Sequence, residues 1–169
     1  MTVNELDAAA AAHARELLTA CCGASPWVDA MLAARPFRDR ERLFAAADRA
    51  WADLTAEQLG DAIARHPRLG ASRAKAALST REQAWSAGEQ SGAGSADDAA
   101  RAALAEGNEA YERRFGHMFI LCATGLGAAE MLAALRRRLG NDAATERDIT
   151  GAELQKITRL RLEKLLAGA

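Results

Sequence analysis

The strongest constraint on the fold is a regular succession of signals that start and stop helices. The segments Thr2–Glu5, Thr55–Gln58 and Ser79–Glu82 each have the spacing of a capping box, in which two side chains satisfy free amides at a helix start. Gly23 and Gly140 stand where an apolar stripe ends, as glycines commonly do at helix C-termini. Between these signals, apolar residues recur with the period of a helix face. The chain is therefore expected to form helix after helix.

The predicted fold is all-α, with about seven or eight helices in a single compact domain over residues 1–169. The apolar stripe from Leu6 to Ala20 predicts one continuous first helix. The exception to the helical pattern is the short apolar run 117–124, which lies between glycine-containing turns. We expect this run to be extended, and one solitary extended segment cannot build a sheet.

The overall charge argues against a nucleic-acid partner. The formal net charge is -1, and the densest basic run, Arg136–Arg138, is interpreted as the solvated side of a helix. No segment approaches the roughly 18 apolar residues of a membrane span, and the first residues do not have the pattern of a secretory signal. We therefore expect a cytoplasmic protein with no membrane partner.

The cysteines and histidines do not have the spacing of a metal site. Cys21, Cys22 and Cys122 are expected to be reduced, packed thiols, because adjacent cysteines rarely pair. The three histidines are scattered along the chain, so no metal ligand set is predicted. His117 follows a glycine and is interpreted as structural or exposed.

Three polar residues stand in positions where chemistry is possible. His66 precedes Pro67, and a residue before proline is disfavoured in a helix, so His66 is expected where a helix stops. There it could meet Glu89 in a cleft and take part in proton transfer, or simply cap the last carbonyls. Glu89 could equally be a solvated side chain near a frayed helix end. Arg161 interrupts an apolar stripe, where it could hold an anion or only pair structurally.

The run Phe119–Ala123 also has two interpretations. Its side chains are suited to filling a core. An extended, unpaired backbone also offers N–H and C=O groups that must be satisfied, and a ligand rich in amides could do so.

A series of short motifs extends over nearly the whole chain: Ser25-Pro26-Trp27, Ala34–Phe37, His66–Gly70, Ser86–Gln90 with Ala93-Gly94, Asn108 with Tyr111, Arg114–Gly116, Phe119–Ala123, Arg138–Asp142 with Glu146, and Leu160–Leu162. Together, and in this order, these motifs resemble the 2-oxo-4-hydroxy-4-carboxy-5-ureidoimidazoline (OHCU) decarboxylase family. Arg68, where animal members often have Asp, and His117-Met118, where they usually have Phe-Pro, depart from the pattern.

The resemblance implies an all-helical homodimer that decarboxylates OHCU to (S)-allantoin and CO2 in urate degradation, without metal or other cofactor. It implies that His66 is the proton donor and that Glu89 and Arg161 are the other polar active-site residues. It further implies that a set of neighbouring residues contacts the substrate: Pro67, Ser86, Ala87, Gly88, Gln90, Phe119, Ile120, Leu121, Cys122 and Ala123.

Two alternatives to a decarboxylase come from different functional classes. The chain could be a helical interaction module that has lost activity, although the presence of all three polar residues argues against this. It could also be a related enzyme that hydrolyses another ureide or hydantoin, which an assay of CO2 release would distinguish.

Overall fold

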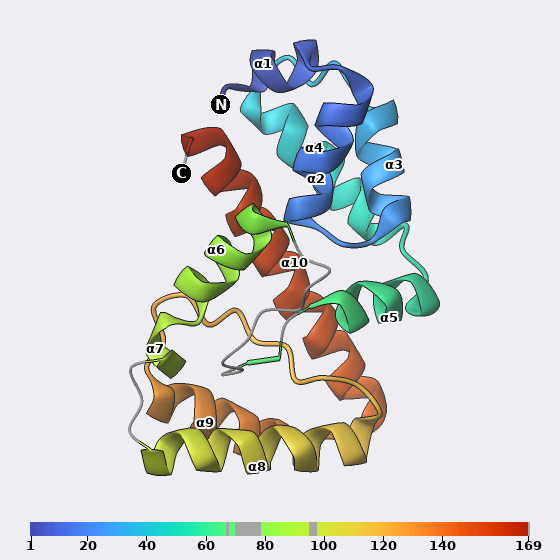
Figure 1. The fold of residues 1–169 in the computed structure, drawn as a ribbon. Coiled ribbons are helices and arrows are strands. Elements are labelled where there is room, and N and C mark those ends of the chain that lie inside the picture. Colours follow the sequence, from blue (N-terminus) through green and yellow to red (C-terminus); the bar gives the residue numbers. More distant parts are fainter. Residues whose placement is uncertain (67, 70–78, 95–97, 169) are drawn as a thin grey trace. The chain divides into compact units, whose positions relative to one another are not determined.

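The computed structural model in Figure 1 describes residues 1–66, 68–69, 79–94 and 98–168. Within these residues helices are the only regular secondary structure, which confirms the predicted all-α class. None of these helices combines the length and apolarity needed to cross a bilayer. The helices are α1 (Val3–Ala8), α2 (Ala11–Cys21), α3 (Ser25–Ala33), α4 (Arg40–Ala52), α5 (Ala56–Arg65), α6 (Thr80–Glu89), α7 (Ser91–Gly94), α8 (Asp98–Phe115), α9 (Ala128–Arg138) and α10 (Ala143–Ala167).

The chain divides into two compact units, which we describe separately. One unit contains residues 1–65 and 155–169, and the other contains residues 66–154. In the first unit the core includes Leu18, Trp27 and Leu43, each with essentially no exposed surface. The Trp27 indole donates a hydrogen bond to the Ala47 carbonyl over 3.1 Å, so its one polar atom is satisfied inside the core.

The predicted continuous first helix is wrong, because the structure divides it into α1 and α2. Ala9 and Ala10 between them leave the helical conformation, with ψ angles of 143° and 145°. The Arg35 guanidinium donates hydrogen bonds to the carbonyls of Asp7 and Ala9, which a continuous helix would use itself. The Asp7 carboxylate in turn accepts from the Phe37 amide over 2.8 Å. A contact distant in sequence therefore overrides the local helical pattern.

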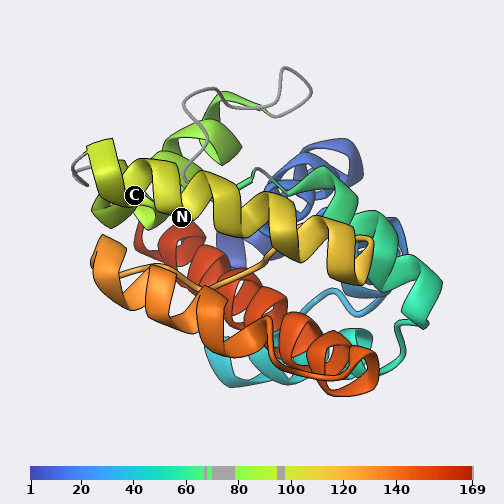
Figure 2. The ribbon, with the colours of Figure 1, turned by 90° about the horizontal axis from the view of Figure 1, so that it is seen from below.

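In the second unit α8 packs against α9. A Cβ atom on Gly107 would lie 2.4 Å from the Leu135 side chain, so the glycine allows close approach there. The core around this contact includes Tyr111, Phe119 and Met131. In Figures 1 and 2 the connection from α8 to α9 is a long thread without helical coils. Residues 117–124, predicted as a non-helical apolar run, are neither helix nor strand, although Thr124 already lies in a turn.

Candidate active site

His66 directly follows the last residue of α5, as its position before a proline predicts. Its side chain is partly buried, and Pro67 lies outside the described residues. Helix α8 contacts the two described residues that come next. The buried Asn108 side chain donates to the Leu69 carbonyl over 3.0 Å, and Glu112 forms an ion pair with Arg68 at 2.6 Å. The chain after His66 is therefore attached to α8 at two consecutive residues.

Glu89 is the last residue of α6, and it is only 5% exposed. Ser86 and Trp85 lie on the same buried face, one turn earlier. Ala87 and Gly88 are exposed, and the partly buried Gln90 caps the helix by donating from its backbone to the Ser86 carbonyl over 3.1 Å. Within the predicted substrate-contacting stretch, Ser86 and Glu89 thus face the interior, and Ala87 and Gly88 do not.

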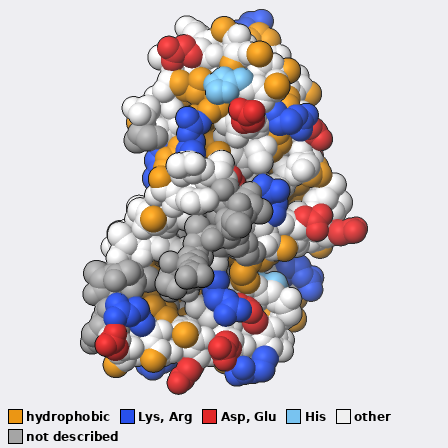
Figure 3. Space-filling model, in the orientation of Figure 1, with side chains coloured by type: hydrophobic (Ala, Val, Ile, Leu, Met, Phe, Trp, Pro, Cys, Tyr) orange, Lys and Arg blue, Asp and Glu red, His pale blue; other side chains and the backbone are white. Residues whose placement is uncertain are grey.

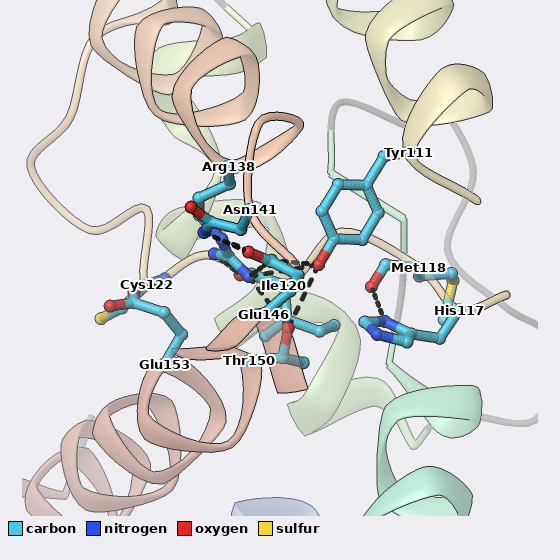
Figure 4. A network of polar contacts seen from close by, with 10 residues as sticks. All are labelled: Tyr111, His117, Met118, Ile120, Cys122, Arg138, Asn141, Glu146, Thr150 and Glu153. Carbon is cyan, nitrogen blue, oxygen red and sulfur yellow. Dashed lines mark hydrogen bonds and ion pairs between the residues drawn. The ribbon is translucent and has the colours of Figure 1, made fainter. Parts of the chain in front are cut away.

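The segment Phe119–Ala123 is buried at Phe119, Ile120 and Ala123 and partly buried between them. Two of its backbone groups bond to charged side chains. The Ile120 carbonyl accepts from Arg138 Nη1 over 2.6 Å, and the Cys122 amide donates to Glu153 over 2.8 Å. Figure 4 shows Ile120 within a larger polar network around Arg138, with Cys122 and Glu153 to one side of it.

At the centre of that network Arg138 and Glu146 form a buried ion pair with an N–O distance of 2.6 Å. The Tyr111 hydroxyl donates to the same carboxylate, the Asn141 side chain donates to it over 2.8 Å, and Thr150 accepts from Arg138 over 2.9 Å. Each charged group therefore has several partners, which is the condition under which charges are tolerated in a protein interior.

This arrangement shifts the ionisation of two groups. Burial opposes ionisation of Glu146, but the hydrogen bonds from Arg138, Tyr111 and Asn141 outweigh it and hold the pKa of the carboxyl below its ordinary value. Burial raises the pKa of Tyr111 to about 12, assisted by the hydrogen bond that its hydroxyl donates to Glu146. The network consequently contains a carboxylate and a neutral phenol over the physiological pH range.

The interpretation of Arg136–Arg138 as a solvated helix side is wrong for Arg138. Arg136 and Arg137 are exposed, whereas Arg138 is 3% exposed. Arg138 follows the buried residues Ala134 and Leu135 by four and three positions, so it continues their stripe on α9. Helical periodicity could therefore have identified Arg138 as the buried member of the run.

Arg161 belongs to the other unit, on the C-terminal part of α10. It is 6% exposed, and its Nη1 donates to the Ala20 carbonyl near the end of α2 over 3.4 Å. Cys22 lies nearby, and burial raises the pKa of its thiol despite the opposing charge of Arg161. None of the described cysteines forms a disulfide, in agreement with the predicted reduced thiols.

The structure thus places His66, Glu89 and the segment 119–123 in one unit and Arg161 in the other. The His117 ring stands edge-on to Tyr111, with 5.5 Å between ring centroids, so the structural interpretation of His117 is correct. Sequence reasoning did not identify Arg138, Glu146 and Glu153 as supports of the segment.

On the face drawn in Figure 3, the described Lys/Arg and Asp/Glu side chains are interspersed and form no large field of one sign.

Comparison with known proteins identifies the family of this chain. The sequence model of the OHCU decarboxylase family matches residues 7–163. The chain belongs to this family. The resemblance carried by the sequence motifs is therefore confirmed.

Two curated relatives are similar to parts of this chain. The chain is 34% identical over 148 residues to the uric acid degradation bifunctional protein TTL of Arabidopsis thaliana, covering 87% of this chain and 45% of that protein. It is 39% identical over 105 residues to the 2-oxo-4-hydroxy-4-carboxy-5-ureidoimidazoline decarboxylase of Amia calva, covering 60% of this chain and 57% of that protein. The chain thus spans about half the length of the curated relatives it matches.

Solved structures share the fold. The crystal structure of an OHCU decarboxylase in the presence of (S)-allantoin matches with a TM-score of 0.75 and 29% identity, over 90% of this chain and 98% of that one. The crystal structure of an (S)-allantoin synthase matches with a TM-score of 0.72 and 20% identity, over 98% of this chain and 54% of that one, and shows likeness of fold alone. The helical arrangement described above is therefore that of an OHCU decarboxylase.

Proposed function

We propose that this chain is a carboxy-lyase that converts OHCU to (S)-allantoin and CO2 in urate degradation, without a cofactor. The observation that carries the proposal is the family match over residues 7–163, which includes His66, Glu89 and Arg161. Glu89 and Arg161 are both buried, as expected of side chains that bind a small substrate in a site closed to bulk solvent. Since the match includes residues of both units, we also propose that residues 1–169 act as one domain.

The substrate itself supplies what a cofactor would otherwise provide. The carbon that bears its carboxylate neighbours a ring C=N bond. When the bond to CO2 breaks, its electron pair can move into this imine and leave an enediol-like intermediate. The enzyme has to hold the carboxylate out of the ring plane while this bond breaks, and afterwards it has to deliver a proton to one face of the ring.

We assign the proton transfer to His66, because histidine titrates near neutral pH and acts as acid and base. Glu89 accepts hydrogen bonds from ring or ureido N–H groups. Arg161 donates to an oxygen that gains negative charge as CO2 departs, rather than to the departing carboxylate, since holding the carboxylate tightly would stabilise the ground state. The backbone of Phe119–Ala123, with Pro67 and Ser86–Gln90, contacts the rest of the substrate.

The direct test uses freshly prepared OHCU, with the product followed by circular dichroism. The spontaneous reaction has no chiral acid and gives a racemate, whereas we expect this protein to yield optically active (S)-allantoin with CO2. Activity should persist after dialysis against a chelator. Loss of activity on dialysis, restored by added metal, would contradict the cofactor-free mechanism.

His66→Ala should lower turnover by about two to four orders of magnitude, the usual contribution of a general acid-base group. His117→Ala is the matched control, since its ring packs on Tyr111, and its turnover should stay close to that of the wild type. Near-native stereospecific turnover of His66→Ala would remove His66 from the mechanism.

We further propose that the active form is a cytoplasmic homodimer, as the family resemblance implies. One chain has a mass of 17.9 kDa. Light scattering at micromolar concentration should therefore report particles of twice that mass, and particles of the single-chain mass would contradict the dimer.

A further inference from the structure

The segment Phe119–Ala123 is anchored along one edge of its backbone. The Arg138 guanidinium donates a hydrogen bond to the Ile120 carbonyl over 2.6 Å, and the Glu153 carboxylate accepts one from the Cys122 amide over 2.8 Å. Arg138 lies on α9 and Glu153 on α10, so the anchors come from two different helices of the same unit. Figure 4 shows Glu153 beside Cys122 and Arg138 reaching Ile120.

The spacing of the two anchored groups determines what the other edge presents. In extended backbone the N–H and C=O of one residue point to one edge, and those of the next residue point to the opposite edge. The segment runs without helical coils in Figure 1, and we take its backbone to be extended. Ile120 and Cys122 are two residues apart, so their anchored groups then share an edge. The N–H and C=O of Leu121 then lie on the opposite edge. Within the described part of the chain, neither the N–H nor the C=O of Leu121 forms a hydrogen bond.

We propose that Glu153 and Arg138 are positioning residues that present the N–H and C=O of Leu121 to the ligand as an adjacent donor and acceptor. This inference rests on the proposed function. One donor beside one acceptor is complementary to a single amide edge, in which an N–H stands next to a C=O. Ureido groups and lactam rings have such edges. The anchoring side chains therefore recognise the substrate indirectly, through the backbone that they hold in place.

Arg138 is too deeply buried for a clean test, because its removal also leaves Glu146 without its cation. Glu153 is only partly buried and lies outside the Arg138–Glu146 ion pair. Glu153→Leu removes the acceptor at similar size, while Glu153→Gln keeps an acceptor oxygen. Glu130 offers a matched control, since it also accepts from a backbone amide of this connection, that of Gly127, over 2.8 Å.

The experiment measures KM, kcat and (S)-allantoin affinity for the full-length variants, together with hydrogen exchange in the peptide that contains Cys122. Glu153→Leu should raise KM and the allantoin dissociation constant about tenfold, as loss of one charge-assisted hydrogen bond does. Its kcat should change little, because the edge binds substrate and transition state alike. Exchange at Cys122 should accelerate.

Glu153→Gln should restore affinity, and Glu130→Leu should keep wild-type KM. Equal KM values for Glu153→Leu and wild type would overturn the positioning role, as would a Glu153→Gln variant as impaired as Glu153→Leu. A wild-type protein that neither converts OHCU nor binds (S)-allantoin would instead refute the proposed function, and this inference with it.

Discussion

The two segments to which we assign much of the chemistry are held by ion pairs of the same length in opposite surroundings. Arg138, which anchors Phe119–Ala123, pairs with Glu146 at 2.6 Å, and Arg68, near His66, pairs with Glu112 at 2.6 Å. The side chains of the first pair are 4% and 0% exposed, whereas those of the second are 44% and 27% exposed.

Burial, rather than distance, decides how much of the structure depends on each pair. Water can replace a lost partner at the exposed pair, and dissolved salt screens its attraction. Neither water nor salt has such access to the buried pair, so removal of one member leaves an uncompensated charge. The segment 119–123 should therefore be sensitive to single substitutions in its supports, while the Arg68 contact should tolerate them.

The largest expected effect is that of Arg138→Met. It should lower the free energy of unfolding by about 3–5 kcal/mol, the usual cost of leaving one member of a buried ion pair alone. Urea denaturation provides the measurement, with Arg137→Met as the control because Arg137 is the exposed neighbour. Similar losses of unfolding free energy in the two variants would show that burial of the ion pair does not set its importance.

Tyr111→Phe should destabilise the protein by about 1.5–3 kcal/mol, the range for a hydrogen bond to a charged group. Tyr111 is the chain's single tyrosine, so its ionisation can be followed directly by ultraviolet absorption. The midpoint should lie near pH 12, and the associated stability should be complete below pH 10 and lost as pH rises through 12. A midpoint near 10 would show that the hydroxyl is not held in the network.

Acid should weaken the buried pair through Glu146. Because its pKa is lowered in the folded protein, its contribution to stability is complete above the ordinary value of 4.5 and is lost as the pH falls through the lowered pKa. The slope from this one group cannot exceed about 1.4 kcal/mol per pH unit. Denaturation series between pH 6 and about 2.5 should show a shallower acid loss in Glu146→Gln than in wild type. If the free energy of unfolding fell in parallel with pH in both proteins, Glu146 would not be the source of the acid sensitivity.

The smallest effect is expected at the exposed pair. Glu112→Gln should change the free energy of unfolding by no more than about 1 kcal/mol, and the change should shrink as salt is added. A double-mutant cycle with Arg68→Met isolates the coupling between the two residues. A coupling as large as that of the buried pair would show that burial does not distinguish the two segments.

Local signals predicted much of the fold. The capping boxes at Thr2 and Ser79 form as expected, and α5 ends immediately before His66. The break at Ala9 could not be predicted, because its cause is Arg35, which lies 26 residues away. Helix boundaries are thus encoded nearby in the chain except where a distant side chain competes for the same carbonyl.

The candidate site was less accessible to physical reasoning from the sequence. Pattern alone placed His66 at a helix end, but the roles of Glu89 and Arg161 came from the family resemblance. The supports of Phe119–Ala123 were missed because Glu153 reaches Cys122 across 31 positions of sequence. No periodicity in α10 singles out one glutamate as a backbone acceptor. Such contacts follow from the packing of helices, which local patterns do not specify.

The position of Trp85 has an optical consequence. This indole is buried on α6 one turn before Glu89, while the other two tryptophans, Trp27 and Trp51, belong to the other unit. Indole emission depends on the polarity and charge of its immediate surroundings. The difference between the fluorescence spectra of the wild type and Trp85→Phe therefore isolates a reporter on the helix that carries Glu89. Its change on titration with (S)-allantoin would follow ligand occupancy at equilibrium and in stopped flow, with no label attached to the protein.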